Sequence, residues 1–209
     1  MVGQGKLPGV RYRMLEVLVM CRSFRIFACS CAWLSLLIWL ARAAAAPPTP
    51  DHVVIVIEEN HSFDQVMGSA SAPYLNSLAQ SGMSFTNFYG ITHPSQPNYL
   101  QFFSGSNQGV TSNSTPAGPF TTPNLGAALI AAGHSFGGYS QSMPSVGFNG
   151  DSYTSVPGQT QYMRKHNPWV NWQSASPAAN QLPTSVNMPF TSFPSDYSTL
   201  PKVSIVVPD

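Results

Sequence analysis

Two short polar segments carry the side chains most able to do chemistry. Residues 58–64 (Glu-Glu-Asn-His-Ser-Phe-Asp) follow an apolar run and supply carboxylates and an amide. Residues 92–99 (Thr-His-Pro-Ser-Gln-Pro-Asn-Tyr) place one hydroxyl, that of Ser95, between two prolines. Carboxylate and amide oxygens suit hard divalent metals, and a serine becomes a good nucleophile when a metal or base activates it. The pair of segments therefore favours attack on a phosphate ester.

Glu59 and Asn60 are the candidate metal ligands. They directly follow the apolar run at 52–57, and ligands of α/β sheets gather outside the carboxyl ends of the strands. These two side chains could supply part of a Ca²⁺ or Mg²⁺ shell. The alternative is a polar strand end in which Asn60 or Ser62 caps a following turn.

Ser95 is the candidate nucleophile, and a divalent metal could activate it. Asn98, three residues later, could donate a hydrogen bond to a non-bridging phosphate oxygen as negative charge develops. The alternative is a turn, stabilised by proline, that caps the helix predicted from residue 99.

His166 is the third candidate catalytic residue. It follows Arg164 and Lys165 directly in the sequence, and such a cluster could steer an anionic substrate and offer a proton donor. The alternative is a solvated loop in which His166 stacks on Trp169. The other histidines lack partners at the spacing of zinc ligands.

Hydrophobic patterns predict strands that alternate with helices, which is typical of an α/β fold. The continuous β-branched run at 52–57 indicates a strand buried on both faces of a parallel sheet. Asn124 is placed to cap a helix at 123–132. Further strands are predicted at 83–89, 135–140 and 202–207, and further helices at 73–79, ending at Gly82, and from 99 to 103.

Residues 143–197 show no sustained periodicity and are rich in Pro, Ser, Asn and Gly. They also contain Trp169, Trp172, Phe190 and Phe193, so we interpret them as a folded, loop-rich insertion.

The N-terminus indicates export. Residues 1–46 combine basic residues, an apolar run and a final stretch of alanines, as in a signal peptide. An uncleaved anchor is the alternative, although the run is short for a stable membrane span. Residues 47–50 form a Pro-rich linker, and the domain is predicted at 51–209. A secreted product is therefore expected.

Removal of this leader changes the charge balance. Six of the nine basic residues and one of the eight acidic residues lie in 1–46, so three basic and seven acidic residues remain. A net charge near −4 disfavours nucleic-acid binding. All three cysteines also lie in the leader, which excludes a disulfide scaffold.

Three segments, 58–62, 92–99 and 162–171, together resemble the bacterial phosphoesterase family that groups phospholipases C with acid phosphatases, within the alkaline phosphatase superfamily. The likeness is strongest to secreted acid phosphatases of the phosphatidylinositol-3-phosphatase type. It implies a mostly parallel sheet flanked by helices, with Glu59, Asn60 and Ser95 on a divalent metal. It also implies that Ser95 forms a phosphoseryl intermediate and that Asn98 steadies the transferred group, while His166 lies in the acid phosphatase segment.

The sequence also departs from the pattern of this family near its C-terminus. Family members continue beyond the strand at 202–207 and supply further metal ligands and a histidine there. We therefore expect a domain that is incomplete at its C-terminus, inactive alone and left with exposed strand edges. The expected substrate is a small-molecule or lipid-headgroup phosphate ester. The alternatives are a phospholipase C-like phosphodiesterase and a non-catalytic exported remnant or binding module.

Overall fold

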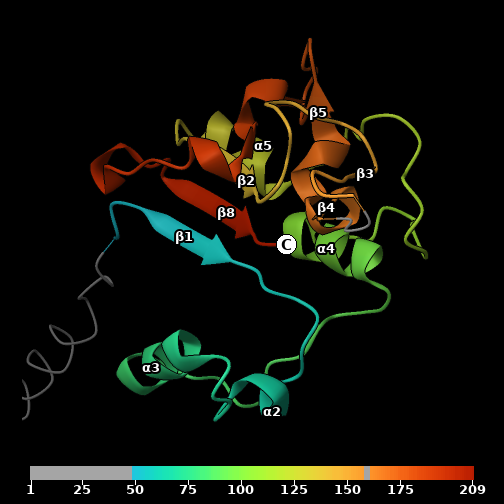
Figure 1. The fold of residues 1–209 in the computed structure, drawn as a ribbon. Coiled ribbons are helices and arrows are strands. Elements are labelled where there is room, and N and C mark those ends of the chain that lie inside the picture. Colours follow the sequence, from blue (N-terminus) through green and yellow to red (C-terminus); the bar gives the residue numbers. More distant parts are fainter. Residues whose placement is uncertain (1–48, 158–160) are drawn as a thin grey trace, which may run out of the picture. The chain divides into compact units, whose positions relative to one another are not determined.

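A parallel sheet of four strands, in the order β1-β8-β2-β7, organises the described part of the chain (Figure 1). The strands are β1 (Val53–Val56), β2 (Phe136–Ser140), β7 (Asn187–Pro189) and β8 (Val203–Val207). The computed structural model describes residues 49–157 and 161–209. The predicted signal peptide and residues 47 and 48 of the linker lie outside these residues. The predicted α/β fold is confirmed.

β8 lies inside the sheet because it pairs with β1 on one side and β2 on the other, and four of its five residues are buried. The strand predictions at 135–140 and 202–207 are therefore confirmed. Ile205 of β8 joins the hydrophobic core around which the sheet and helices pack. The other fully or largely buried core residues are Leu100, Phe103, Phe136, Trp169, Val170, Trp172, Leu182, Val186 and Val207.

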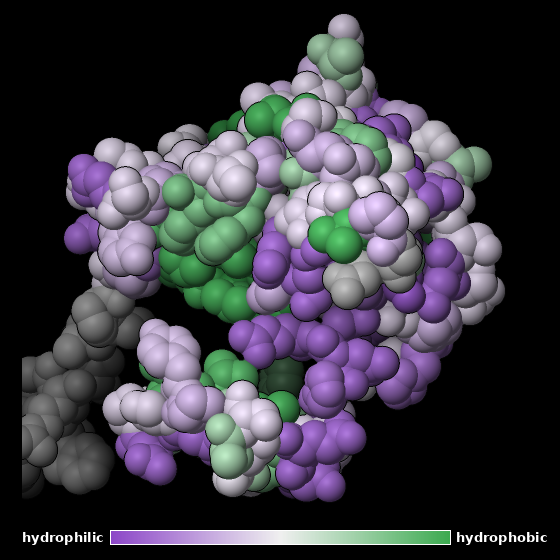
Figure 2. All heavy atoms as spheres, viewed as in Figure 1, coloured by the Kyte–Doolittle hydropathy of each residue, from purple (hydrophilic) through white to green (hydrophobic). Residues whose placement is uncertain are grey.

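The prediction that residues 52–57 are buried on both faces is wrong. β1 lies at the edge of the sheet, and Val53, Val54 and Val56 are 37, 42 and 54% exposed. A β-branched run favours a strand but does not fix its place in the sheet, and here β8 is the one strand that pairs with β1. Figure 2 shows apolar surface over this part of the sheet.

The strand predicted at 83–89 is also wrong. The segment is irregular, and its side chains Met83, Phe85, Phe88 and Tyr89 are exposed. A strand needs a neighbour to satisfy its backbone groups, and none of the described strands pairs with this segment.

Three of the described helices correspond to predicted ones, whereas the short helix at Phe63–Val66 was not predicted. The helices are α2 (Phe63–Val66), α3 (Pro73–Ser81), α4 (Ser95–Ser104) and α5 (Leu125–Ala131). The Asn124 side chain accepts a hydrogen bond from the Ala127 N–H at 2.9 Å and caps α5 as predicted. α4 begins at Ser95, four residues before the predicted start, and ends at Gly105 with φ 70°.

The loop-rich segment is folded and contributes to the sheet. Trp169 and Trp172 are completely buried, and β7 pairs with β2. Trp169 packs so closely on Gly138 of β2 that a Cβ there would lie 2.2 Å from the indole. Its remaining short elements are β3 (Ser152–Tyr153), β4 (Tyr162–Met163), η1 (Arg164–His166), η2 (Pro168–Trp172), β5 (Gln173–Ser174), β6 (Leu182–Pro183), η3 (Thr184–Val186) and η4 (Phe190–Ser192), followed by η5 (Tyr197–Thr199).

Candidate active site

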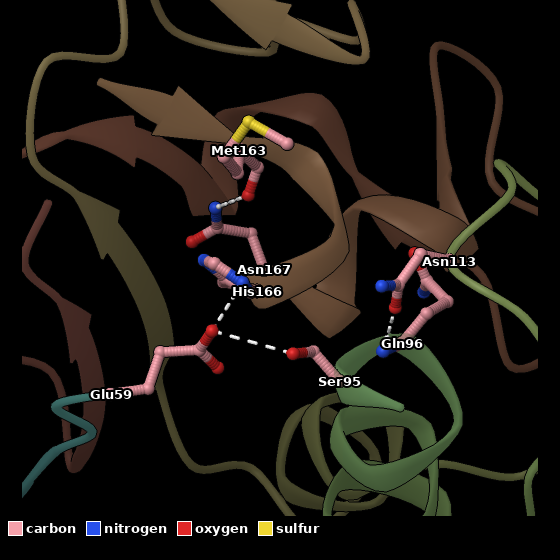
Figure 3. Close-up of polar contacts among 7 residues, drawn as sticks. All are labelled: Glu59, Ser95, Gln96, Asn113, Met163, His166 and Asn167. Atoms are coloured by element: carbon pink, nitrogen blue, oxygen red, sulfur yellow. Dashed lines mark hydrogen bonds and ion pairs between the residues drawn. The ribbon is translucent and has the colours of Figure 1, made fainter. Parts of the chain in front are cut away.

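Three segments distant in sequence meet at the carboxylate of Glu59 (Figure 3). Glu59 follows the carboxyl end of β1, Ser95 begins α4, and His166 ends η1. The Ser95 hydroxyl donates to Glu59 Oε1 over 3.4 Å, and His166 Nε2 forms an ion pair with the same oxygen at 2.6 Å. A hydroxyl, a carboxylate and an imidazole are thus within reach of one another.

Ser95 does not cap α4 with its side chain. Pro94 holds the N-cap position, and the helix has no side-chain cap there. Instead, Asn113 Oδ1 accepts a hydrogen bond from the Gln96 N–H at 3.1 Å. The Ser95 hydroxyl is therefore free to donate to Glu59. Ser95 lies at the N-terminal end of α4, where the helix dipole favours an anion.

His166 is held by packing and by its neighbour Asn167. Its ring lies against Tyr99, with centroids 5.4 Å apart and planes tilted by 31°, rather than on Trp169 as the alternative had it. Asn167 is buried and accepts a hydrogen bond from Ser140 Oγ of β2 at 2.6 Å. Its Nδ2 donates to the Met163 carbonyl at 2.9 Å. These contacts fix η1 near the carboxyl end of the sheet.

The sequence interpretation did not single out Tyr99 as a site residue. Tyr99 is buried on α4, and its ring supports His166. Its hydroxyl faces Glu59 but makes no hydrogen bond of standard geometry. Burial and the negative charge of Glu59 both raise the pKa of Tyr99. The signal was available, because residues four apart on a helix, such as Ser95 and Tyr99, share a face.

The charge of Glu59 is stabilised by its surroundings. Burial alone raises the pKa of this carboxyl, but the contact with His166 and the charge of its imidazolium lower it. Tyr99 and Lys165 lower it further, so the pKa of Glu59 lies below its ordinary value. Glu59 is therefore held in its ionised form, which suits it to bind a cation.

The other two predicted site residues, Asn98 and Asn60, do not contact Glu59, Ser95 or His166 through hydrogen bonds. Asn98 Oδ1 accepts hydrogen bonds from the N–H groups of Ile91 and Thr92 at 2.8 and 3.3 Å, which fixes the loop before α4. Its Nδ2 does not take part in these bonds. Asn60 is exposed, and no hydrogen bond joins it to Glu59, Ser95 or His166 in the structure.

The donor types fit a hard divalent metal, but the donor number does not complete a shell. Glu59, Asn60 and Ser95 offer a carboxylate, an amide and a hydroxyl, whereas Ca²⁺ and Mg²⁺ take about six oxygen ligands. Within residues 49–157 and 161–209, no group of three or more His, Cys, Asp or Glu side chains is arranged to hold a metal.

An apolar groove of about 440 Å³ adjoins this site. Glu59, Asn98 and Tyr99 line its polar end. Its apolar walls are Ile55, Val56, Ile57, Phe88, Tyr89, Ile91 and Phe102. The cluster of Ser95, Glu59 and His166 therefore lies next to a surface that can bind apolar atoms.

Residues 69–209 match the family model described as "Phosphoesterase family". The chain belongs to this phosphoesterase family. The match includes Ser95, Asn98 and His166, whereas Glu59 and Asn60 precede it. The resemblance seen in the three sequence segments is thereby confirmed.

Curated relatives of this phosphoesterase include bacterial and fungal phosphatases. A phosphatidylinositol-3-phosphatase of Mycobacterium tuberculosis is 40% identical over 180 residues, which cover 85% of this chain and 56% of the relative. A phosphate-repressible acid phosphatase of Penicillium chrysogenum is 31% identical over 81% of this chain and 42% of its own length. The chain thus spans about half the length of these relatives. No solved structure matches the chain significantly.

No helix among the described residues is long and apolar enough to cross a membrane.

Proposed function

We propose that this phosphoesterase hydrolyses phosphate monoesters, with Ser95 as the nucleophile. The observation that carries the proposal is the convergence of Ser95 Oγ and His166 Nε2 on one oxygen of Glu59. Membership of the phosphoesterase family and the likeness to acid phosphatases support the reaction class.

The geometry gives each side chain a role. Ser95 Oγ attacks phosphorus while its proton passes to Glu59, and the ester oxygen leaves with a proton donated by His166. The product of this step is an alcohol and a phosphoseryl group. Water then attacks this group and gives a proton to His166, while Ser95 Oγ leaves with the proton held by Glu59, so inorganic phosphate is released and all three side chains return to their starting states. Asn98 Nδ2 donates to a non-bridging oxygen of the phosphoryl group.

We also propose that a Ca²⁺- or Mg²⁺-type ion binds through Glu59, Asn60 and Ser95, together with ligands beyond these three. Such an ion lowers the pKa of a bound hydroxyl and neutralises phosphate charge. Chelation with EDTA should then abolish turnover, and added Mg²⁺ or Ca²⁺ should restore it. Full activity after exhaustive chelation would contradict the metal and leave Glu59 as the base.

The nucleophile is tested with Ser95→Ala in the product of the natural gene and in the 209-residue chain. Loss of the nucleophile should lower kcat on p-nitrophenyl phosphate by about 10³-fold or more. Ser81→Ala is the matched control, because Ser81 is exposed on α3 and bonds only within that helix. Acid quenching followed by mass spectrometry should find the phosphoryl group on Ser95. Undiminished turnover in Ser95→Ala would refute the assignment.

The apolar groove beside Glu59 favours an ester that carries apolar atoms. One relative is named a phosphatidylinositol-3-phosphatase, and we propose a phosphoinositide among the substrates of this chain. The same groove fits a phospholipase C-like diesterase. Release of inorganic phosphate from phosphatidylinositol 3-phosphate, without release of phosphocholine from phosphatidylcholine, separates the monoesterase from the diesterase.

We propose secretion as the location of the protein, on the strength of the leader pattern in residues 1–46. N-terminal sequencing of the exported product should begin near residue 47. A product that keeps residue 1 would contradict cleavage.

A further inference from the structure

A positively charged side chain is buried away from the Ser95 site with little to compensate it. Arg164 is 8% exposed. One terminal nitrogen donates to the Asn149 carbonyl and the other to Asn171 Oδ1, both at 3.2 Å. Its Nε makes no hydrogen bond. Both acceptors are neutral, so the positive charge itself has no close counter-ion in these contacts.

No carboxylate among residues 49–157 and 161–209 lies within ion-pair distance of Arg164. The ion pair recorded among these residues joins His166 to Glu59. Asp151 lies close enough to act on the guanidinium through its charge only, and its carboxylate accepts a hydrogen bond from Thr115. Burial of an unpaired charge costs several kcal/mol, and buried charges are ordinarily paired. The arrangement therefore calls for a further anion.

The structure provides space for one beside Arg164. A cavity of about 100 Å³ is lined by Arg164 and by residues of the loop that precedes α5. Its volume exceeds the ~30 Å³ that one water occupies in the liquid. Its walls are Pro116, Gly118, Pro119, Asn149, Arg164, Val170 and Gln173.

We propose that this cavity is a binding site for a small inorganic anion held by Arg164. Water could fill the volume and hydrate the side chain, whereas an anion would also neutralise its charge. The site is separate from the phosphatase chemistry, because the Arg164 side chain contacts Asn149 and Asn171 whereas His166 contacts Glu59. Arg164 and His166 nevertheless belong to the same short helix, η1. A bound anion therefore stabilises the segment that presents His166.

Bromide and nitrate are suitable probes, because both are small and do not resemble the phosphate product. Thermal unfolding of the chain is followed as bromide replaces gluconate at constant ionic strength. Binding to the folded state should raise the Tm in a saturable manner. Arg164→Gln should abolish this rise. Lys202→Gln removes the same charge from a part-buried side chain that does not line the cavity and should keep the rise in Tm.

Two results would overturn the proposal. One is a Tm that does not respond saturably to either anion in the unaltered chain, and the other is an equal response in Arg164→Gln. If Arg164→Gln does not fold, Arg164→Lys and diffraction decide the question. The lysine variant keeps the charge but lacks the planar guanidinium, so its response should be weaker. Bromide-soaked crystals should show an anomalous peak in the cavity beside Arg164, and an empty cavity at saturating bromide would refute the site.

Discussion

The contact between Glu59 and His166 should be measurable as a coupling energy. Nε2 and Oε1 are 2.6 Å apart, and the side chains of His166 and Glu59 are 16 and 25% exposed. Exposed ion pairs contribute about 0.2–1 kcal/mol, whereas hydrogen bonds to charged groups contribute about 1.5–3 kcal/mol. This half-buried pair lies between the two classes, so we expect a coupling of about 1–2 kcal/mol.

The assay is a double-mutant cycle with Glu59→Gln and His166→Gln, followed by urea unfolding. The measurements are made at about pH 5.5, where histidine side chains are ordinarily protonated. Each single substitution leaves its partner without the charged contact and should lower the free energy of unfolding. The double substitution should cost less than the two single costs added together.

A second cycle provides the control. His134 is exposed and is not the partner of Glu59 in the ion pair, so His134→Gln with Glu59→Gln makes the same chemical changes without the contact. These two should add within about 0.3–0.5 kcal/mol. If the Glu59 and His166 variants also add within that margin, the ion pair does not stabilise the site and our reasoning about it is wrong.

Two further predictions concern the packing of buried residues. Gly138→Ala would place a Cβ 2.2 Å from the Trp169 indole, so urea unfolding should show a loss of about 3 kcal/mol or more in the free energy of unfolding. Gly105→Ala is the control, because Gly105 has φ 70° and open space around it, and it should lose only about 1–2 kcal/mol. Equal losses in the two variants would contradict the steric argument. Tyr99→Phe removes a buried hydroxyl that makes no standard hydrogen bond, so the free energy of unfolding should stay equal or rise, and a loss above about 1 kcal/mol would show that the hydroxyl bonds to Glu59.

The sequence predicted those elements whose signals are local. The helix at α5 follows from the Asn124 cap and its apolar face, and β2 and β8 follow from their composition. The place of each strand in the sheet depends on pairing between distant segments. The β-branched run of β1 is therefore compatible with a central or an edge position, and the structure has it at the edge.

The site shows the same division. Ser95 and Tyr99 are four residues apart on one helix, so their shared face was available from spacing alone. The partner of the His166 ring could not be predicted from spacing. Tyr99 lies 67 positions earlier, and the two rings meet through the packing of α4 against η1. The aromatic neighbour in the sequence, Trp169, is instead completely buried, and its indole donates to Asn187.

The position of β1 has a consequence for the chemistry. Glu59 follows β1, whose three valines are exposed, and among the strands that the structure describes β1 pairs with β8 alone. Exposed edge strands open more readily than buried ones, so the carboxylate that joins Ser95 to His166 follows a strand of this exposed kind.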